Sequence, residues 1–440
     1  MRFFPRLGVR RRAVHAVLAA LLLVAGAAPS LPAQAITRAA ALDAALRRGP
    51  RLAAAAADTS AALAALRAAQ ALANPTLALS YSKAVPRVHA IVDYPIVDAF
   101  LLRGGRSAAA TSLREAAGFR FAAARAAILV DVDTTYTRAL AADARARLTR
   151  RTAVDGAELR RIAQARRDAG DASDLDVRLA NVSAGQLANA AAADSLAAVS
   201  ALIAVQVSMG MSPDSVTIVL ADTLGDPPVL AAADPGTAGL GRDPATSGAG
   251  AQPPVAPLAT DRLLGVVAAQ RSLAAAQQSV RVAQLGRYGV PSITAGIEGV
   301  DPTQGGERGI LPTFGVSIPL PFLSRNGAVV QAAQAERDRA TAELAVARLD
   351  AAGALARAQR DRAAALVRLE RDRALAADAD AVAAMALRAY QEGASPLPNV
   401  LQARRDARDL LAQTVEDRAA AWNATAALRA ASLTIDHPAP

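Results

Sequence analysis

The sequence contains no cysteine and only three histidines, His15, His89 and His437. Without cysteine there can be no disulfide, no thiolate metal site and no lipid-bearing N-terminal cysteine. A histidine-built metal site would need at least two of the three histidines to meet, which is improbable. We therefore expect no bound metal ion and no cofactor.

Sequence signatures of catalytic chemistry are also missing. There is no G-x-S-x-G, no P-loop, no H-E-x-x-H and no G-x-G-x-x-G after a strand. Asp131 and Asp133 lie two residues apart, which points them to different faces of a helix and makes them a poor acid–base pair. We interpret both as solvated charge and expect no enzymatic activity.

The excess of positive charge is small once the N-terminus is set aside. Basic residues outnumber acidic residues by 49 to 39, but five of the arginines lie in the first 35 residues, which contain no acid. The remaining 44 basic and 39 acidic residues leave little net charge for so long a chain. We expect no nucleic-acid partner.

The N-terminus has the regions of a secretory signal peptide. Three arginines at 10–12 precede an apolar stretch at 16–28, and Ala33-Gln34-Ala35 fits an A-x-A cleavage site. The apolar stretch is shorter than the about 20 residues that span a bilayer, which disfavours a permanent anchor. We expect residues 1–35 to be removed, the mature chain to begin near Ile36, and no membrane-spanning helix to follow.

The rest of the chain divides into two similar halves, residues 36–211 and 260–433. Apolar periodicity predicts helices at 37–73, 105–168 and 174–207, and again at 260–286, 327–391 and 396–433. Alternating residues predict strand hairpins at 76–101 and 292–321, with strands at 76–82, 94–101, 293–300 and 314–320. Residues 212–259 are a predicted linker with a strand-like run at 216–220, residues 221–258 are expected to have low order, and 434–440 form a tail.

A junction of sequence F-L-x-R-x-G occurs once in each half. It places Phe100, Arg103 and Gly105 in the positions of Phe322, Arg325 and Gly327, at an offset of 222 residues. The same offset relates Ser173 and Leu175 to Ser395 and Leu397, at the helix breaks near 170 and 394. The matched spacing predicts an internal repeat in which glycine allows the chain to turn sharply from strand to helix.

The element lengths favour a long tube with a β-barrel part. A helix over 327–391 would be about 98 Å long, and the two shorter helices of each half sum to nearly the same length. Four strands are too few to close a barrel, but three chains would supply twelve. Aromatic residues in or beside the strands suit a lipid-interface girdle, although ordinary strand packing also favours them: Tyr81, Tyr94, Phe100, Phe314 and Phe322.

The chain resembles the TolC-like outer membrane factors, the exit ducts of tripartite efflux pumps and type I secretion systems. The resemblance is carried by ITRAAALDAALRRGPRLAAA, ANPTLALSYS, YGVPSITAGIE, FGVSIPLPFLSRNGAVVQAAQAER and AYQEGASPLPNVLQARRDARDLL, and covers nearly all of residues 36–433. The fourth stretch is most similar to the heavy-metal and solvent efflux branch. The resemblance implies a homotrimer in the Gram-negative outer membrane, with a periplasmic adaptor and an inner-membrane pump as partners.

By the same resemblance, the breaks near 170 and 394 form a periplasmic tip that closes the duct and docks the adaptor. The tip residues are Asp168, Gly170, Asp171, Ser173, Asp174, Leu175, Asp176, Gly393, Ser395, Leu397 and Asn399. Threefold symmetry would turn each of the four aspartates into a ring of three carboxylates that attracts cations. The alternatives are that Asp174 caps its helix and that the acids are a solvated face. The second tip has no nearby acid except Glu392.

The sequence therefore predicts a mainly α-helical outer-membrane duct that conducts cargo passively and performs no chemistry. In this interpretation the junction arginines lie at the boundary between membrane and water. Two alternatives stay open. One is the outer-membrane component of a type I protein secretion system, and the other is a secreted or periplasmic coiled-coil structural protein.

Overall fold

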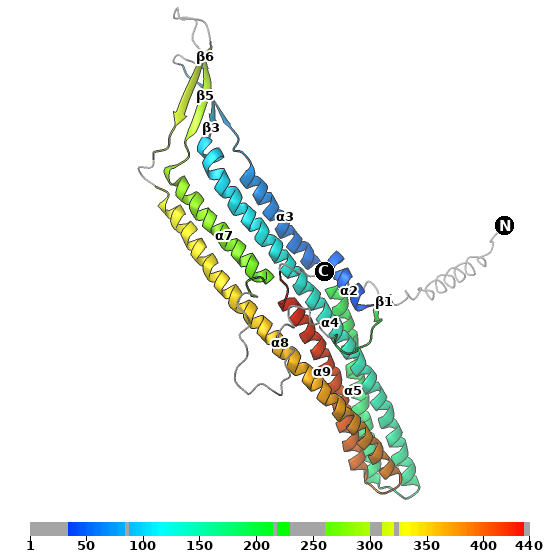
Figure 1. Ribbon diagram of the computed structural model, residues 1–440. Helices are drawn as coiled ribbons and strands as arrows, with labels where there is room; N and C mark the ends of the chain where they lie inside the picture. The colour runs from blue at the N-terminus through cyan, green and yellow to red at the C-terminus, as the bar shows by residue number, and fades with distance from the viewer. Residues whose placement is uncertain are drawn as a thin grey trace, which may run out of the picture.

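The computed structural model describes residues 34–83, 88–213, 218–228, 260–299, 310–320 and 325–434. The molecule is a long rod, with a β-sheet at one end and the tips of two helical hairpins at the other (Figure 1). Most of the predicted signal peptide, most of the linker, Phe322 and the end of the tail lie outside the described residues.

Two long helices run the length of the helical part of the rod. Helix α4 (Arg103–Asp168) has 66 residues and α8 (Gly327–Gln391) has 65, so each is nearly 100 Å long. Helices α3 (Pro50–Gln70) and α5 (Asp174–Ser208) pack along α4, and α7 (Leu264–Leu285) and α9 (Leu397–Ala431) pack along α8. The predicted pairing of one long helix with two shorter helices in each half is confirmed.

The helix predicted at 37–73 is broken into two. Thr37 caps α2 (Arg38–Arg48) by accepting a 3.2 Å hydrogen bond from the Ala40 amide. Gly49 then ends α2, and Pro50 begins α3 at a position where its missing N–H costs nothing. A Cβ at Gly49 would lie 2.2 Å from the Ala45 carbonyl oxygen, so this break requires glycine.

Four antiparallel strands form one sheet in the order β2-β3-β5-β6. The first half supplies β2 (Thr76–Tyr81) and β3 (Val88–Tyr94), and the second supplies β5 (Ser292–Gly299) and β6 (Ile310–Ser317). Strand β3 pairs with β5 and so joins the two hairpins. Among the described residues, the outer edges of β2 and β6 have no strand partner.

The strand predicted at 94–101 is wrong. The second strand of the first hairpin is β3, and it ends at Tyr94. Pro95 follows, and because proline has no N–H to donate to a ladder, it begins a helical segment instead. That segment includes a π-helix, η1 (Asp98–Leu102), and continues directly into α4. Strand β6 also ends earlier than predicted, at Ser317 rather than residue 320.

A second, small sheet lies at the middle of the rod. Strand β1 (Gln34–Ile36) pairs in parallel with β4 (Ile218–Leu220) beside α2 (Figure 1). The largest buried cluster surrounds this sheet and includes Tyr136, Leu140 and Met209. The expectation of low order is therefore wrong for residues 221–228, where Leu224 is buried; residues 229–259 lie outside the described part of the chain.

Two helices, α3 and α5, are long and apolar enough to cross a membrane by length and composition alone, although no spanning helix was expected. Alanine accounts for much of this hydropathy. Both helices pack lengthwise on α4, and most of their surface is exposed in the single chain.

Candidate functional site

The register of the four-stranded sheet separates apolar from polar side chains. Residues that pair across a sheet point to the same face, and successive residues of a strand point to opposite faces. One face consists of four apolar rows: Tyr94–Ile293–Val316, Leu77–Val92–Ala295–Phe314, Leu79–Ala90–Ile297–Pro312 and Tyr81–Val88–Gly299–Ile310. Its side chains are open to the surroundings, with Phe314 82% exposed and Tyr81 72% exposed.

The opposite face of the sheet is mostly polar. Its rows include Thr76–Asp93–Thr294–Gly315 and Ser80–His89–Glu298–Leu311. The Ser292 hydroxyl donates to Asp93, and His89 lies 3.4 Å from the Glu298 carboxylate. Strands with one exposed apolar face and one polar face have the alternation found in the wall of a water-filled barrel in lipid.

The junction residues do not play the same part in the two halves. Phe100 lies in η1 and is 76% exposed near the base of the sheet. Arg103 donates through Nε to the Gln70 carbonyl at 2.7 Å and ties the start of α4 to the end of α3. Gly105 lies within α4, where a Cβ would come within 2.5 Å of the Val282 side chain, so it permits close helix packing rather than a turn.

In the second half, asparagine and not glycine makes the turn. Asn326 has φ 50° in the left-handed region, its side chain donates to the Gly286 carbonyl at 3.1 Å, and α8 begins at the next residue, Gly327. Arg325 is exposed just before it. The predicted turning role of Gly105 and Gly327 is therefore wrong, because helix geometry is already established at both glycines.

The two tip hairpins end their long helices in the same way. Gly170 and Gly393 have φ of 86° and 80°, a conformation that glycine adopts without strain. The Asp171 amide donates to the Arg166 carbonyl, and the Ala394 amide to the Ala389 carbonyl, each at 2.8 Å. These are the bonds of the Schellman motif, which satisfies the free carbonyls at a helix end. The glycines predicted from the repeat thus have a defined structural role.

Three of the four tip aspartates, Asp168, Asp174 and Asp176, make local side-chain contacts. Ser173 and Asp176 form a capping box at the start of α5, with the Asp176 amide donating to the Ser173 hydroxyl at 3.2 Å. Asp174 pairs with Arg167 at 3.0 Å, and Asp168 accepts from Gln164 at 3.0 Å. Ser173, and not Asp174, is therefore the capping residue.

The repeat breaks down at its two tip leucines. Leu397 is fully buried in a cluster with Leu159, Ala163, Ala180, Tyr390 and Val400, whereas Leu175 is 63% exposed. Beside this cluster, the Asn399 side chain donates to the Ser395 hydroxyl at 3.1 Å. The same residue type at the same repeat position thus packs inside the protomer in one hairpin and faces outward in the other.

Arg166 joins the two hairpins, and sequence analysis missed it. Its guanidinium donates to the Tyr390 carbonyl, near the end of α8, and to the Asp171 carbonyl at 3.4 Å. Its Cζ lies 4.8 Å from the centroid of the Tyr390 ring. Burial raises the pKa of the Tyr390 phenol, while the charge of Arg166 lowers it in part. Arg166, in the last turn of α4, therefore contacts the last turn of α8 through both the backbone and the ring of Tyr390.

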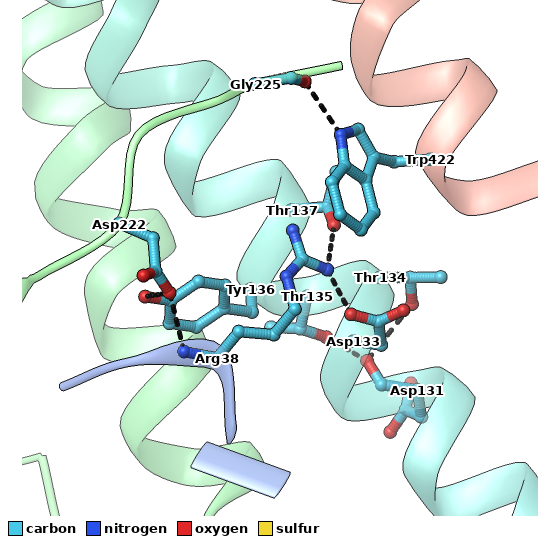
Figure 2. Close-up of polar contacts among 10 residues, drawn as sticks. All are labelled: Arg38, Asp131, Asp133, Thr134, Thr135, Tyr136, Thr137, Asp222, Gly225 and Trp422. Carbon is cyan, nitrogen blue, oxygen red and sulfur yellow. Dashed lines mark hydrogen bonds and ion pairs between the residues drawn. The ribbon is translucent and has the colours of Figure 1, made fainter. Parts of the chain in front are cut away.

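A second polar cluster, at the middle of the rod, was also missed (Figure 2). Arg38 of α2 lies between two aromatic rings, with Cζ 4.1 Å from the Trp422 centroid and 5.3 Å from that of Tyr136. Its guanidinium pairs with Asp133 and donates to Thr137 at 2.9 Å. Asp133 is thus an ion-pair partner within the protein, and its interpretation as solvated charge is wrong; Asp131 pairs with Arg51 at 2.6 Å.

Tyr136 anchors both small strands of this cluster. Its hydroxyl donates to the Ile36 carbonyl at 2.8 Å and bonds to Asp222 at 2.9 Å. Asp222 also accepts from the Arg38 amide at 2.7 Å. Burial, and then the hydrogen bond to Asp222, raise the pKa of the Tyr136 phenol well above its ordinary value. Trp422 donates to the Gly225 carbonyl at 2.8 Å, which fixes residues 218–228 against α9.

These observations define a class of protein: a rod of long helical hairpins with a four-stranded, two-faced sheet at one end. Solved bacterial outer-membrane channels have the same fold. The outer-membrane channel OprN has 19% identity and a TM-score of 0.70, over 90% of this chain and 89% of that chain. The outer membrane protein VceC from Vibrio cholerae has 17% identity and a TM-score of 0.69, over 90% and 95%.

The CmeC outer membrane channel of Campylobacter jejuni has 14% identity and a TM-score of 0.71, over 90% of this chain and 85% of that chain. No family model and no curated protein matches the sequence. At these identities, the structural likeness establishes the fold, mainly helical with four antiparallel strands.

Proposed function

We propose that this protein is the outer-membrane exit duct of a tripartite efflux system. Three copies would close a twelve-stranded barrel in the outer membrane and extend a helical tube into the periplasm. Cargo would pass through the water-filled interior, driven by an inner-membrane pump that connects through a periplasmic adaptor. The observation that carries this proposal is the four-stranded sheet, which has one apolar face, one polar face and two unpaired edges.

The unpaired edges argue for closure by other copies of the chain. Backbone groups without partners are prohibitive in hydrocarbon, so a sheet in a membrane must be a closed barrel. Strands β2 and β6 are the two edges of each protomer, and pairing β6 of one copy with β2 of the next continues the antiparallel order. Three copies would give twelve strands, within the range of outer-membrane barrels.

The tube region supports the same assembly. Exposed apolar side chains lie along α5 and α8. They include Val182, Leu196, Val199 and Ile203 of α5 and Val346 and Leu349 of α8. Leu196, Val199 and Ile203 recur at helical spacing and so lie on one face of α5, and an exposed apolar face of this kind marks an interaction site. Neighbouring protomers are the occupants that the proposed barrel would bring alongside these helices.

The tip is the proposed gate and adaptor-docking surface. The tip cluster around Leu397 is small, and Arg166 is a polar link between the ends of the two hairpins. Breaking this link would let the hairpins separate, which suits a mouth that opens when an adaptor docks. The rings of tip carboxylates remain part of this proposal, with Asp174 and Asp176 restrained by their local contacts.

The test is to extract the full chain from outer membranes, determine its oligomeric state, and measure conductance in planar bilayers. The proposal predicts trimers that form ion-conducting pores. Soluble monomers or dimers without conductance would contradict it and favour the coiled-coil structural alternative. Cargo export measured with each candidate pump would then separate small-molecule efflux from type I protein secretion.

A further inference from the structure

A cleft of about 390 Å³ lies between the two helical hairpins, on the sheet side of the tip cluster. It is lined by α4 and α5 of the first half and by α8 and α9 of the second. Its size falls at the lower end of the range of small-molecule sites. Any molecule bound there would contact both halves of the protomer at once.

Leucine side chains form much of the wall of the cleft. Six leucines line it, and each is buried or half-buried: Leu148, Leu159, Leu187, Leu387, Leu401 and Leu411. Gly156 brings α4 and α5 close together at one wall, since a Cβ there would lie 2.6 Å from the Leu187 side chain. The leucines thus give the cleft an apolar surface, which favours an apolar ligand body.

Charged side chains around the cleft are mostly positive. Four arginines line it, Arg151, Arg404, Arg405 and Arg408, against the carboxylates of Asp155 and Asp380. Arg404 donates to the Asp155 carbonyl, and Arg408 bonds to its sequence neighbour Asp409. Within the described ranges, Arg151 and Arg405 make no hydrogen bond or ion pair. Two guanidinium groups are therefore available beside an apolar surface.

We propose that this cleft binds a small amphiphilic organic anion, with a carboxylate or sulfonate on Arg151 and Arg405 and an apolar body against the leucines. Guanidinium matches carboxylate geometry in a bidentate way, and the excess of arginine over aspartate disfavours cations. By bridging the hairpins, such an anion stabilises their packing and opposes their separation. The site stands on residues within one protomer and does not depend on the proposed duct function.

The experiment titrates purified full-length protein with 2-naphthoate by isothermal calorimetry, in a polymer that replaces detergent micelles. Saturable binding is expected, and it weakens as salt is added. The double variant Arg151→Ala/Arg405→Ala is expected to bind at least about tenfold more weakly. The neutral analogue 2-naphthalenemethanol is expected to bind at least about tenfold more weakly to the unchanged protein.

The matched control is Arg160→Ala/Arg371→Ala, which removes two exposed arginines from α4 and α8 outside the cleft. This control is expected to bind 2-naphthoate like the unchanged protein. Arg151→Lys/Arg405→Lys keeps the charge and is expected to restore part of the affinity. Absence of saturable binding, equal binding by the Arg151→Ala/Arg405→Ala variant, or equal binding of the neutral analogue would each overturn the proposal. Because no conductance is measured, the result is independent of whether the chain forms pores.

Discussion

The middle of the rod and its tip are held together in contrasting ways. At the middle, Tyr136, Leu140 and Met209 are fully buried, and Arg38, Asp222 and Trp422 connect α2, α4, α9 and residues 218–228. At the tip, a small cluster around Leu397 joins the two hairpins, together with hydrogen bonds from Arg166 to the Tyr390 carbonyl and from Arg404 to the Asp155 carbonyl. The comparison indicates a hub around Tyr136 with a large buried cluster and a tip with a small one, so truncations at the hub are expected to cost more stability than truncations at the tip.

The largest effect is expected from Tyr136→Ala at the hub. Tyr136 is fully buried, so its loss leaves a cavity and removes the hydrogen bonds to Ile36 and Asp222. We expect unfolding free energy to fall by about 4 kcal/mol in urea denaturation. Tyr81→Ala, which removes a tyrosine that is 72% exposed in the single chain, is the control, and a similar loss for both would contradict the hub assignment.

A smaller effect is expected from Leu397→Ala at the tip. Leu397 is fully buried, and truncating it should cost about 3 kcal/mol in local stability, read as faster amide hydrogen exchange around 390–401. Its repeat counterpart, Leu175, is 63% exposed, and Leu175→Ala should cost less than about 0.5 kcal/mol. Equal effects would mean that the two tips are equivalent after all.

Arg166→Ala should alter opening more than stability. The variant loses the hydrogen bond to the Tyr390 carbonyl and the stacking on the Tyr390 ring, which join the two hairpins. In the proposed channel, we expect the ratio of open to closed time in planar bilayers to rise about tenfold. Arg160→Ala, one exposed residue of the same helix, should leave the ratio unchanged. An unchanged ratio in Arg166→Ala would contradict the role of Arg166 in keeping the two hairpins together.

The smallest expected effect is a pH dependence of stability that arises from two carboxyl groups, Asp372 of α8 and Asp417 of α9. A hydrogen bond to Asp417, then burial, raise the pKa of Asp372 above its ordinary value. Burial acts to raise the pKa of Asp417, but hydrogen bonds to Asp372 and Gln413 and the charge of Arg368 hold it below its ordinary value. Asp372 therefore retains the proton that the pair shares.

Folding raises the pKa of Asp372, so the protonated carboxyl stabilises the folded state at pH values below the pKa that this group has in the unfolded chain. This stabilisation is lost as pH rises through the pKa that the group has in the folded state. The wild-type melting temperature should fall by about 1 °C from this source as pH rises above about 4. Asp372→Asn keeps a donor to Asp417 at every pH and should remove that part of the pH dependence. Asp378→Asn, at an exposed position of the same helix, should retain it. Identical pH profiles for Asp372→Asn and the wild type would refute the shared proton.

Much of the fold could be predicted from local patterns. The helix at 327–391 has the predicted bounds, and the breaks at Gly170 and Gly393 follow from the need for a left-handed residue at a helix end. The strand predicted at 94–101 is wrong because Pro95 has no N–H to donate to a strand ladder, and this proline is visible in the sequence.

The site could be predicted only in part. The tip residues can be predicted because the same break occurs in both halves of the repeat. The hub cannot be predicted in this way, because it joins Arg38, Asp133 and Trp422, which are far apart in the sequence and show no local motif. The local sequence around Asp133 does not indicate its ion pair, because Arg38 lies 95 residues away. The different burial of Leu175 and Leu397 arises from packing between hairpins, which a repeat in the sequence does not record.

The most direct test of the account is whether β6 of one copy pairs with β2 of the next. The chain has no cysteine, so disulfides can form only between introduced cysteines. Ser80→Cys would be combined in turn with Leu311→Cys, Thr313→Cys and Gly315→Cys, all on the polar face, with Phe314→Cys on the apolar face as the control. The account predicts covalent trimers under oxidation for at least one polar-face pair. Absence of intermolecular crosslinks at all three polar-face positions would contradict a closed barrel of three chains.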